Sequence, residues 1–251
     1  MERQSRVRSA AAAEVVLAVR DLKKDFSAKK GPAIRALRGV SMEARRAQVT
    51  GLVGADGAGK TTLIRMAAGL LVPTAGSVTV LGLDSVAQSI DIQSRVGYMP
   101  QRFGLYQDLT VAENMALYAD LQGVPRSERS ERYRRLLHMT GLGAYTRRMA
   151  GALSGGMKQK LGLACCLIKS PAMLLLDEPT VGVDPVSRRE LWTIVYELID
   201  KDGIGVLLST AYLDEAERCS HIIVLHEGAV LAEGTPGQFK ERVAGRVQLV
   251  T

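Results

Sequence analysis

The chain has 251 residues, a net charge of +7 and 47% apolar residues, which are the length and balance of a single folded domain. This composition excludes intrinsic disorder, and no apolar run approaches the roughly 20 residues that a membrane-spanning helix needs. The three cysteines form no CxxC pair, which favours a reducing compartment and argues against a cysteine metal site. Basic residues are scattered and aromatic residues make up only 4%, so we expect no nucleic-acid partner.

Short apolar runs rich in valine and leucine predict buried strands along the chain. They lie at residues 14–19, 48–53, 78–81, 96–99, 173–176, 206–209 and 222–225. Helix-length segments separate most of them, beginning with residues 61–70, and this alternation predicts an α/β fold with a mainly parallel sheet. Between residues 101 and 153 the strand pattern stops, and residues 111–121 and 127–139 carry apolar side chains at helical spacing. We therefore expect one α/β core with a helical insert.

The run 48–53 leads into a glycine-rich turn that matches the phosphate-binding pattern GxxxxGK[ST] and opens the helix at 61–70. Glycines let the backbone wrap closely, so that its N–H groups and the helix N-terminus face phosphate groups. Lys60 would reach the terminal phosphates, and the Thr61 hydroxyl would hold Mg²⁺. The predicted nucleotide-binding residues of this turn are Gly54, Ala55, Asp56, Gly57, Ala58, Gly59, Lys60, Thr61 and Thr62.

Two carboxylates, Asp177 and Glu178, follow the apolar run 173–176. An acidic turn after a core strand is an ordinary feature by itself, but its pairing with a phosphate-binding loop predicts the second half of a nucleotide site. Asp177 would complete the Mg²⁺ shell through water. Glu178 would face the γ-phosphate and take a proton from the attacking water.

The segment LSGGMKQ at residues 153–159 precedes a helix and the run 173–176. Together with GADGAGKTT and MLLLDEP it resembles the signature, Walker A and Walker B motifs of the ATP-binding domain of ABC transporters, in the family's order and over residues 16–237. The resemblance implies a P-loop NTPase (RecA-like) core, an N-terminal antiparallel β part and a small helical subdomain. It divides the single domain into a nucleotide-binding core at 14–100 and 159–240, a helical signature subdomain at 101–158, and terminal extensions at 1–13 and 241–251.

The signature segment offers the elements of a second anion clamp. Ser154, Gly155 and Gly156 provide a hydroxyl, two unencumbered N–H groups and a positive helix end. The resemblance implies that this clamp, together with Gln159, closes over ATP that a second ATP-binding domain holds in a head-to-tail dimer.

Three further residues take their roles from the resemblance. Gln101 is similar to the Q-loop glutamine, which contacts Mg²⁺ and supports catalysis, and Asp184 is similar to the D-loop aspartate. Phe26 stands where the family has an aromatic residue that stacks on adenine. For Phe26, packing in the core is an equally open interpretation.

The sequence departs from the family pattern at Ala211, at Asp56 and at Ala47-Gln48, where a Gly-Glu pair is common before the strand. Ala211 stands where the family usually has a histidine that meets the γ-phosphate, and a methyl group cannot donate a hydrogen bond. We therefore expect ATP binding to be retained and turnover at this site to be reduced. Asp56 stands where asparagine is more common, and we expect its carboxylate at the rim, because an inward carboxylate would oppose the triphosphate.

Three large apolar residues, Phe103, Leu105 and Tyr106, follow Gln101 where the family forms a groove for a permease helix. They predict a contact patch for a membrane partner. The alternative, that each packs in the core of the helical subdomain, stays open.

The motifs and the missing histidine together resemble the first ATP-binding half of multidrug-exporter ATPases of the ABC-2 class, of the YbhF type. The resemblance implies a subunit that binds ATP and Mg²⁺, hydrolyses ATP, dimerises with a second ATP-binding domain and drives ABC-2-type membrane permease subunits. It also implies a cytoplasmic location, peripheral on the cytoplasmic face of the cell membrane. Two alternatives stay open: a catalytically weakened regulatory half, and a non-transport ABC ATPase that acts on ribosomes or nucleic acid.

Overall fold

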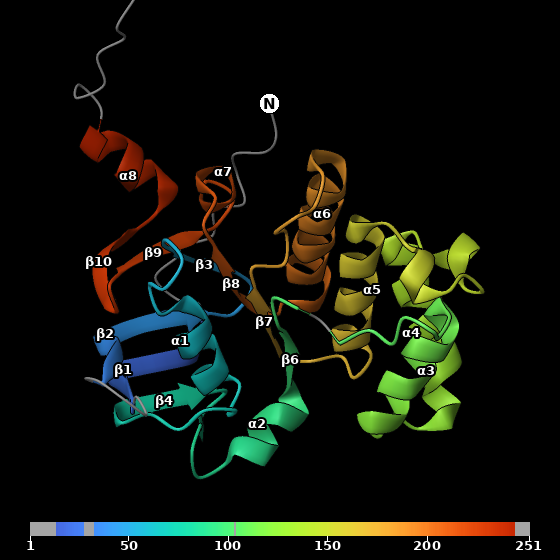
Figure 1. Ribbon diagram of the computed structural model, residues 1–251, viewed down its shortest axis with the longest axis horizontal. Coiled ribbons are helices and arrows are strands. Elements are labelled where there is room, and N and C mark those ends of the chain that lie inside the picture. Colours follow the sequence, from blue (N-terminus) through green and yellow to red (C-terminus); the bar gives the residue numbers. More distant parts are fainter. Residues whose placement is uncertain (1–13, 28–32, 103, 244–251) are drawn as a thin grey trace, which may run out of the picture.

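The computed structural model describes residues 14–27, 33–102 and 104–243. Over these residues the fold consists of two β-sheets and a group of helices (Figure 1). The larger sheet has the strand order β10-β9-β3-β8-β7-β6; its pair β10–β9 is antiparallel and its other pairs are parallel. Its strands are β3 (Val49–Val53), β6 (Val96–Met99), β7 (Met173–Asp177), β8 (Gly205–Thr210), β9 (His221–His226) and β10 (Ala229–Gly234). The expected α/β core with a mainly parallel sheet is confirmed.

The central strands of this sheet are buried along their whole length. Every residue of β3, β7 and β8 is buried, which explains why their sequences are nearly continuous apolar runs rather than alternating ones. The carboxyl ends of these strands lie side by side, since Val53 pairs with Thr210 and Asp177 pairs with Ser209. The loops that follow the three strands therefore meet at one edge of the sheet, where open α/β sheets bind ligands.

The smaller sheet is antiparallel, with the strand order β2-β1-β4-β5. Its strands are β1 (Val15–Phe26), β2 (Ile34–Arg45), β4 (Ala75–Val80) and β5 (Leu83–Asp84). The strand β1 is longer than the run at 14–19 predicts, and β2 and β10 have no counterpart among the expected runs. In β2, the buried side chains Val40, Met42 and Ala44 alternate with Ser41, Glu43 and Arg45, so no continuous run marks the strand.

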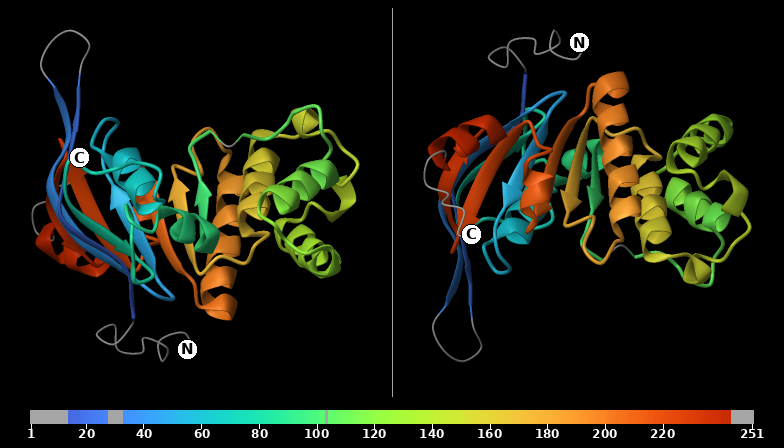
Figure 2. Two further views of the ribbon diagram at one scale, coloured as in Figure 1. Left: turned by 90° about the horizontal axis from the view of Figure 1, so that it is seen from below. Right: turned by 90° about the horizontal axis from the view of Figure 1, so that it is seen from above.

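The helices lie beside and between the sheets. They are α1 (Lys60–Ala67), α2 (Ser89–Arg95), α3 (Val111–Leu121), α4 (Arg126–Thr140), α5 (Gly155–Leu167), α6 (Pro185–Asp202), α7 (Leu213–Ala216) and α8 (Pro236–Val243). Helices α3 and α4 lie at the end of the molecule away from β1 and β2 (Figure 2). The expected end of the helical subdomain, residue 158, falls within α5, and that division stays a prediction. Over the described residues, none of the helices combines the length and the apolar character that crossing a bilayer requires.

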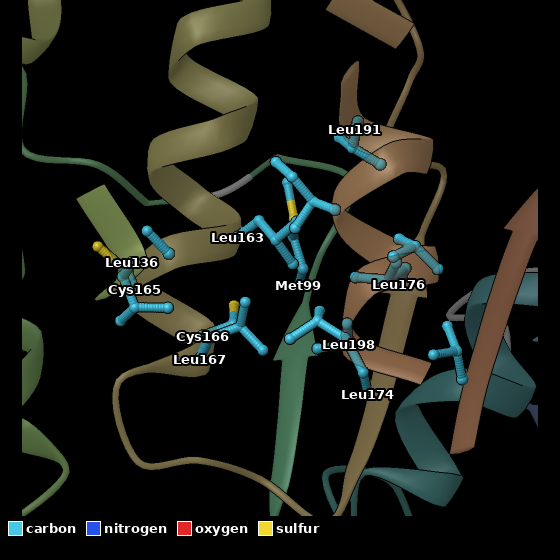
Figure 3. Packing of buried hydrophobic residues seen from close by; sticks show 14 of the residues in the cluster. Met99, Leu136, Leu163, Cys165, Cys166, Leu167, Leu174, Leu176, Leu191 and Leu198 are labelled. Carbon is cyan, nitrogen blue, oxygen red and sulfur yellow. The ribbon is translucent and has the colours of Figure 1, made fainter. Parts of the chain in front are cut away.

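Helices α5 and α6 share an apolar core with the strands β6 and β7. Figure 3 shows Leu163 and Leu167 of α5, Leu198 of α6, Met99 of β6 and Leu174 of β7 gathered in this core. Burying a leucine side chain contributes about 2 kcal/mol. The packing fixes β7 against the two helices, and with it the acidic residues at the end of β7.

The three cysteines are buried and carry free thiols. Burial raises the pKa of the Cys219 thiol to about 12 and also raises the pKa values of Cys165 and Cys166. These thiols are therefore protonated at neutral pH and take no part in the site described below.

Candidate functional site

The turn after β3 is tight and leads directly into α1. Gly57 and Gly59 have φ values of 78° and 102°, in the region that favours glycine. A Cβ at Gly59 would lie 2.7 Å from the carbonyl oxygen of Ala36, so the backbone leaves no room for a side chain there. The first N–H groups of α1 have no partner within the helix. The turn thus forms a cradle for phosphate groups.

Lys60, the first residue of α1, is folded back over this turn. Its Nζ donates to the carbonyl oxygens of Gly54 at 2.7 Å and Ala55 at 3.0 Å, and it pairs with Glu178 Oε1 at 3.0 Å. These contacts use all three N–H donors of the ammonium group. The side chain of Lys60 is 4% exposed and that of Glu178 is 8% exposed, so water hardly screens the pair. A phosphate that binds Lys60 must therefore replace some of these contacts.

Asp177, at the end of β7, holds the start of α1. Its Oδ1 accepts hydrogen bonds from Thr61 Oγ1 at 3.0 Å and from Ser209 Oγ at 2.8 Å. Its Oδ2 is buried and has no hydrogen-bond partner in the described part of the chain. A buried carboxylate oxygen in this state needs a donor or a cation. A Mg²⁺ ion liganded by the Thr61 hydroxyl, with a bound water at Asp177, would meet this need, so these residues fit the metal that the sequence predicts.

Glu178 follows Asp177 in an uncommon backbone conformation. Its φ is 50°, a left-handed value that a glutamate adopts only where the surroundings impose it. Its backbone N–H donates to Ser209 Oγ at 2.9 Å, and Gln101 Nε2 donates to its Oε2 at 2.8 Å. The structure therefore brings together Lys60, Gln101 and Glu178 from three distant parts of the sequence, while their catalytic roles stay predictions.

Ser209 is a residue of this site to which the sequence motifs assign no role. It is fully buried, and its hydroxyl donates to Asp177 while accepting from the backbone N–H of Glu178. A serine at the end of an apolar run is visible in the sequence. Its partner is not, because only the pairing of β7 with β8 brings Ser209 next to Asp177.

An open pocket of about 510 Å³ lies over the phosphate-binding turn. Its lining includes Phe26, Asp56, Lys60, Gln101 and Glu178. Phe26 is 39% exposed and lies outside the buried clusters, which favours base stacking over core packing. Asp56 is exposed, as the charge argument predicts for a carboxylate at the rim.

The signature segment does not line this pocket. Ser154 is the N-cap of α5 and accepts a hydrogen bond from the Met157 N–H at 3.2 Å. Ser154 and Gly155 are exposed and Gln159 is half-buried, whereas Gly156 is buried where a Cβ would lie 2.2 Å from Ser187 Oγ. The N-terminus of α5 is therefore separate from the chain's own phosphate-binding turn, and its binding of an anion stays a prediction.

Asp184 caps α6 next to the signature segment. Its Oδ1 accepts from the backbone N–H groups of Ser187 and Val186, each at 3.0 Å. Hydrogen bonds from the backbone and side chain of Ser187, with that from Val186, hold the pKa of the Asp184 carboxyl below its usual range. In this chain Asp184 fixes the start of a helix, and its action at a nucleotide stays a prediction.

Ala211 lies directly after β8 and is exposed. It is close to the phosphate-binding turn, because the Gly54 N–H donates to the carbonyl oxygen of Thr210 at 3.3 Å. Residue 211 thus lies beside the turn, but its side chain is a methyl group that offers no hydrogen-bond donor to a phosphate.

Three features together define a P-loop NTPase of the ATP-binding cassette type. They are the phosphate-binding turn with its buried lysine, the carboxylates at the end of β7, and the separate helix that begins at Ser-Gly-Gly. The family model described as "ABC transporter" matches residues 37–181. This match covers more than half of the chain. The chain therefore belongs to the ABC transporter ATP-binding family, whose members are ATPases.

Individual relatives agree with this assignment. The "Probable multidrug ABC transporter ATP-binding protein YbhF" of Escherichia coli K12 is 51% identical over 238 residues, which are 95% of this chain and 40% of that protein. The "Daunorubicin/doxorubicin resistance ATP-binding protein DrrA" of Streptomyces peucetius is 38% identical over 214 residues, 85% of this chain and 64% of that protein. A solved structure of an ATP-binding subunit of an ABC transporter matches with a TM-score of 0.79 and 30% identity, over 93% of this chain and 95% of that chain. The chain spans less than half the length of YbhF.

The expected resemblance to multidrug-exporter ATPases is thereby confirmed. The expected P-loop NTPase fold is confirmed as well, because the solved ATP-binding subunit matches nearly the whole chain.

Proposed function

We propose that this chain binds and hydrolyses ATP with Mg²⁺ and supplies the energy for drug export through a separate membrane permease. The observation that carries the proposal is that Lys60 and Glu178 pair at one pocket over the phosphate-binding turn. Thr61 lines the same pocket and donates a hydrogen bond to the buried Asp177 behind it. The names of the relatives YbhF and DrrA support multidrug export. In this function the chain lies on the cytoplasmic face of the membrane, bound to ABC-2-type permease subunits.

The mechanism follows from the contacts of Lys60 and Glu178. Phosphates in the turn attract the ammonium group of Lys60 and weaken its pairing with Glu178. The Glu178 carboxylate, still held by the amide of Gln101, is then available to accept a proton from the attacking water. Thr61, Asp177 and the amide oxygen of Gln101 would together hold Mg²⁺. The charge of the ion would neutralise the phosphate oxygens.

A second ATP-binding domain completes this site in the proposal. The exposed N-terminus of α5, with Ser154 and Gly155, offers first-turn N–H groups that would bind the phosphates of ATP on the partner. Because the N-terminus of α5 does not line the chain's own pocket, it would not contact a nucleotide bound there.

The direct test is to measure ATP hydrolysis and ATP-dependent dimerisation of this chain. We expect binding of ATP with Mg²⁺, a shift from monomer to dimer in size-exclusion chromatography, and turnover below about 1 per second. Failure to bind ATP would overturn the proposal. Binding and dimerisation without hydrolysis would favour a second candidate function, a regulatory half whose nucleotide closes the dimer, which the methyl side chain of Ala211 supports.

The substitution Ala211→His is expected to raise the turnover number about tenfold. An imidazole at this exposed position beside the turn would supply a hydrogen-bond donor for the γ-phosphate that the methyl group lacks. Steady-state hydrolysis of the variant is compared with that of Ala144→His, a control at an exposed position in the helical part. Equal rates for the two variants would show that residue 211 does not limit turnover.

We further propose that the permease contacts a groove beside the helical part. The groove has a volume of about 400 Å³ and is lined by residues of α2, β6, α3 and α5. Its apolar rim is unusually accessible, since Ile90 is 80%, Leu121 68% and Leu70 52% exposed. An apolar side of a permease helix would bury this rim.

The predicted contact patch after Gln101 is separate from this groove, since neither Leu105 nor Tyr106 lines it. Tyr106 is 54% exposed, and its backbone is fixed by two hydrogen bonds with the buried Asn114. Leu105 is half-buried against the core of the helical part, so for Leu105 the packing interpretation is favoured. Phe103 lies outside the described residues.

The substitution Tyr106→Ala is expected to reduce drug efflux by the complete transporter at least about fivefold while the Kd for ATP stays within about twofold. The ring is exposed, so its removal leaves the fold intact, and the residue does not line the nucleotide pocket. Efflux from cells is compared with that of Leu231→Ala, a control at an apolar residue on β10 that is 69% exposed. Loss of ATP binding in Tyr106→Ala would instead assign the residue a structural role.

A further inference from the structure

A cluster of charged and aromatic side chains joins α6 to α7 close to the site. Arg188 of α6 lies with Nη1 3.5 Å from Asp214 Oδ2 and with Nε 3.7 Å from Glu215 Oε1. Its guanidinium carbon lies 4.4 Å from the ring centroid of Tyr212. Arg188 thus touches several residues of the short segment that follows β8. We call Arg188, Thr210, Tyr212, Asp214 and Glu215 the α6–α7 clamp.

Glu215 connects this clamp to the end of β8. It is fully buried, and its Oε2 accepts a hydrogen bond from Thr210 Oγ1 at 2.6 Å. Thr210 Oγ1 in turn accepts from the Tyr212 N–H at 3.0 Å. Thr210 directly follows Ser209, whose hydroxyl binds both Asp177 and the backbone of Glu178. One branch of contacts therefore runs from Arg188 back to the acidic residues of the site.

A second branch reaches the same residues along the chain. The Arg188 N–H donates to the carbonyl oxygen of Asp184 at 3.0 Å in the first turn of α6. Between Glu178 and Asp184 the chain is bound in turns, with Val181 N–H to Glu178 O at 3.3 Å and Val183 N–H to Thr180 O at 3.1 Å. The two branches together form a closed ring of contacts that includes both Arg188 and Glu178.

We propose that Arg188 is a positioning residue for ATP hydrolysis: through Glu215 it holds the turn that carries Glu178 against the turn that carries Ala211. The inference rests on the proposed function. No clamp residue lines the pocket over the phosphate-binding turn, so Arg188 acts through the two turns and not on the nucleotide. The strained φ of Glu178 is the feature that needs such support, because a glutamate released from its surroundings returns to a commoner conformation.

The central contact of the clamp is incomplete. Arg188 Nε and Glu215 Oε1 are both buried and lack hydrogen-bond partners among the described residues, yet they face each other across 3.7 Å. A hydrogen bond of normal length would form after a shift of about 0.8 Å. A small approach of α7 to α6 would therefore be favourable, and the two turns would move together.

The test compares Arg188→Met with Arg189→Met, the neighbouring exposed arginine, which has no ion-pair partner among the described residues. Arg188→Met should lower kcat for ATP about tenfold and leave KM within about twofold, since the pocket is unchanged. Arg189→Met should leave both constants at the wild-type values. A kcat of Arg188→Met within about twofold of wild type would overturn the proposal.

A second variant separates a loss of stability from a loss of catalysis. It is needed because Arg188→Met leaves the buried Glu215 without a counter-charge and should lower the melting temperature by about 10 °C. The double variant Arg188→Met/Glu215→Gln removes that charge and keeps an oxygen that can accept from Thr210. We expect the double variant to regain at least half of the fall in melting temperature, while its kcat stays low. Recovery of kcat together with stability would show a purely structural role and overturn the proposal.

Hydrogen exchange gives a result that does not depend on hydrolysis. In the double variant, the amides of residues 181–187 and of residues 211–216 should both exchange at least about fivefold faster than in wild type. Faster exchange in only one of the two segments would contradict a clamp that joins them. If the wild-type chain binds ATP without hydrolysing it, the proposed function fails at hydrolysis, and the exchange result decides on the clamp by itself.

Discussion

Glu178→Gln is expected to lower the rate of ATP hydrolysis about 100-fold while ATP binding is retained. Glutamine has the shape of glutamate and can keep the contact with Gln101, but it cannot accept a proton from water. The substitution also removes the charge that pairs with Lys60 at 3.0 Å, so phosphates that bind Lys60 no longer compete with a carboxylate. We therefore expect the Kd for ATP to stay equal or to fall a few-fold. Single-turnover hydrolysis and titration with a fluorescent nucleotide measure the two effects.

Glu227→Gln is a matched control for this variant. Glu227 also has a positive φ, 45°, but its side chain is 68% exposed and it lies outside the pocket. Hydrolysis by the control should equal that of wild type. A fall of less than about threefold in Glu178→Gln would contradict the role of Glu178 as the base.

Lys60→Met is expected to weaken ATP binding at least 100-fold, a difference of about 2.7 kcal/mol. Methionine has a similar length but none of the three N–H donors that Lys60 directs at Gly54, Ala55 and Glu178. The variant should also be less stable without nucleotide, by about 3 kcal/mol, because the carboxylate of Glu178 is 8% exposed and loses its counter-charge. Calorimetric titration and thermal unfolding measure the two losses.

The double variant Lys60→Met/Glu178→Gln separates the two effects. Neutralising both partners removes the unpaired buried charge, so part of the lost stability should return. ATP affinity should not return, because the phosphates still lack their ammonium group. If Lys60→Met alone binds ATP within about fivefold of wild type, Lys60 is not the phosphate-binding residue that its position indicates.

Ala211 shows how far the role of a single residue can be predicted from the sequence. The order of the motifs predicts Ala211 beside the site, and the structure places it there, next to the phosphate-binding turn through the contact between Gly54 and Thr210. The sequence could not show that the residues on either side of Ala211 are bound to α6 through Arg188 and Glu215. Those contacts join segments that are distant along the chain, and neither segment carries a recognisable motif for them.

Local patterns by themselves determined the parallel core, the phosphate-binding turn and the acidic end of β7. Each of these depends on residues that are neighbours in the chain: apolar runs form strands, glycines permit the tight turn, and a lysine and a threonine open the helix. No continuous apolar run marks the strand β2, because the residues of its buried face alternate with polar and charged residues of the other face. The tertiary structure decided which distant groups meet, such as Ser209 with Asp177, and Lys60 and Gln101 with Glu178. The physical reason is that strand order and register bring the ends of β3, β7 and β8 to one edge of the sheet, and these long-range pairings leave no local pattern in the sequence.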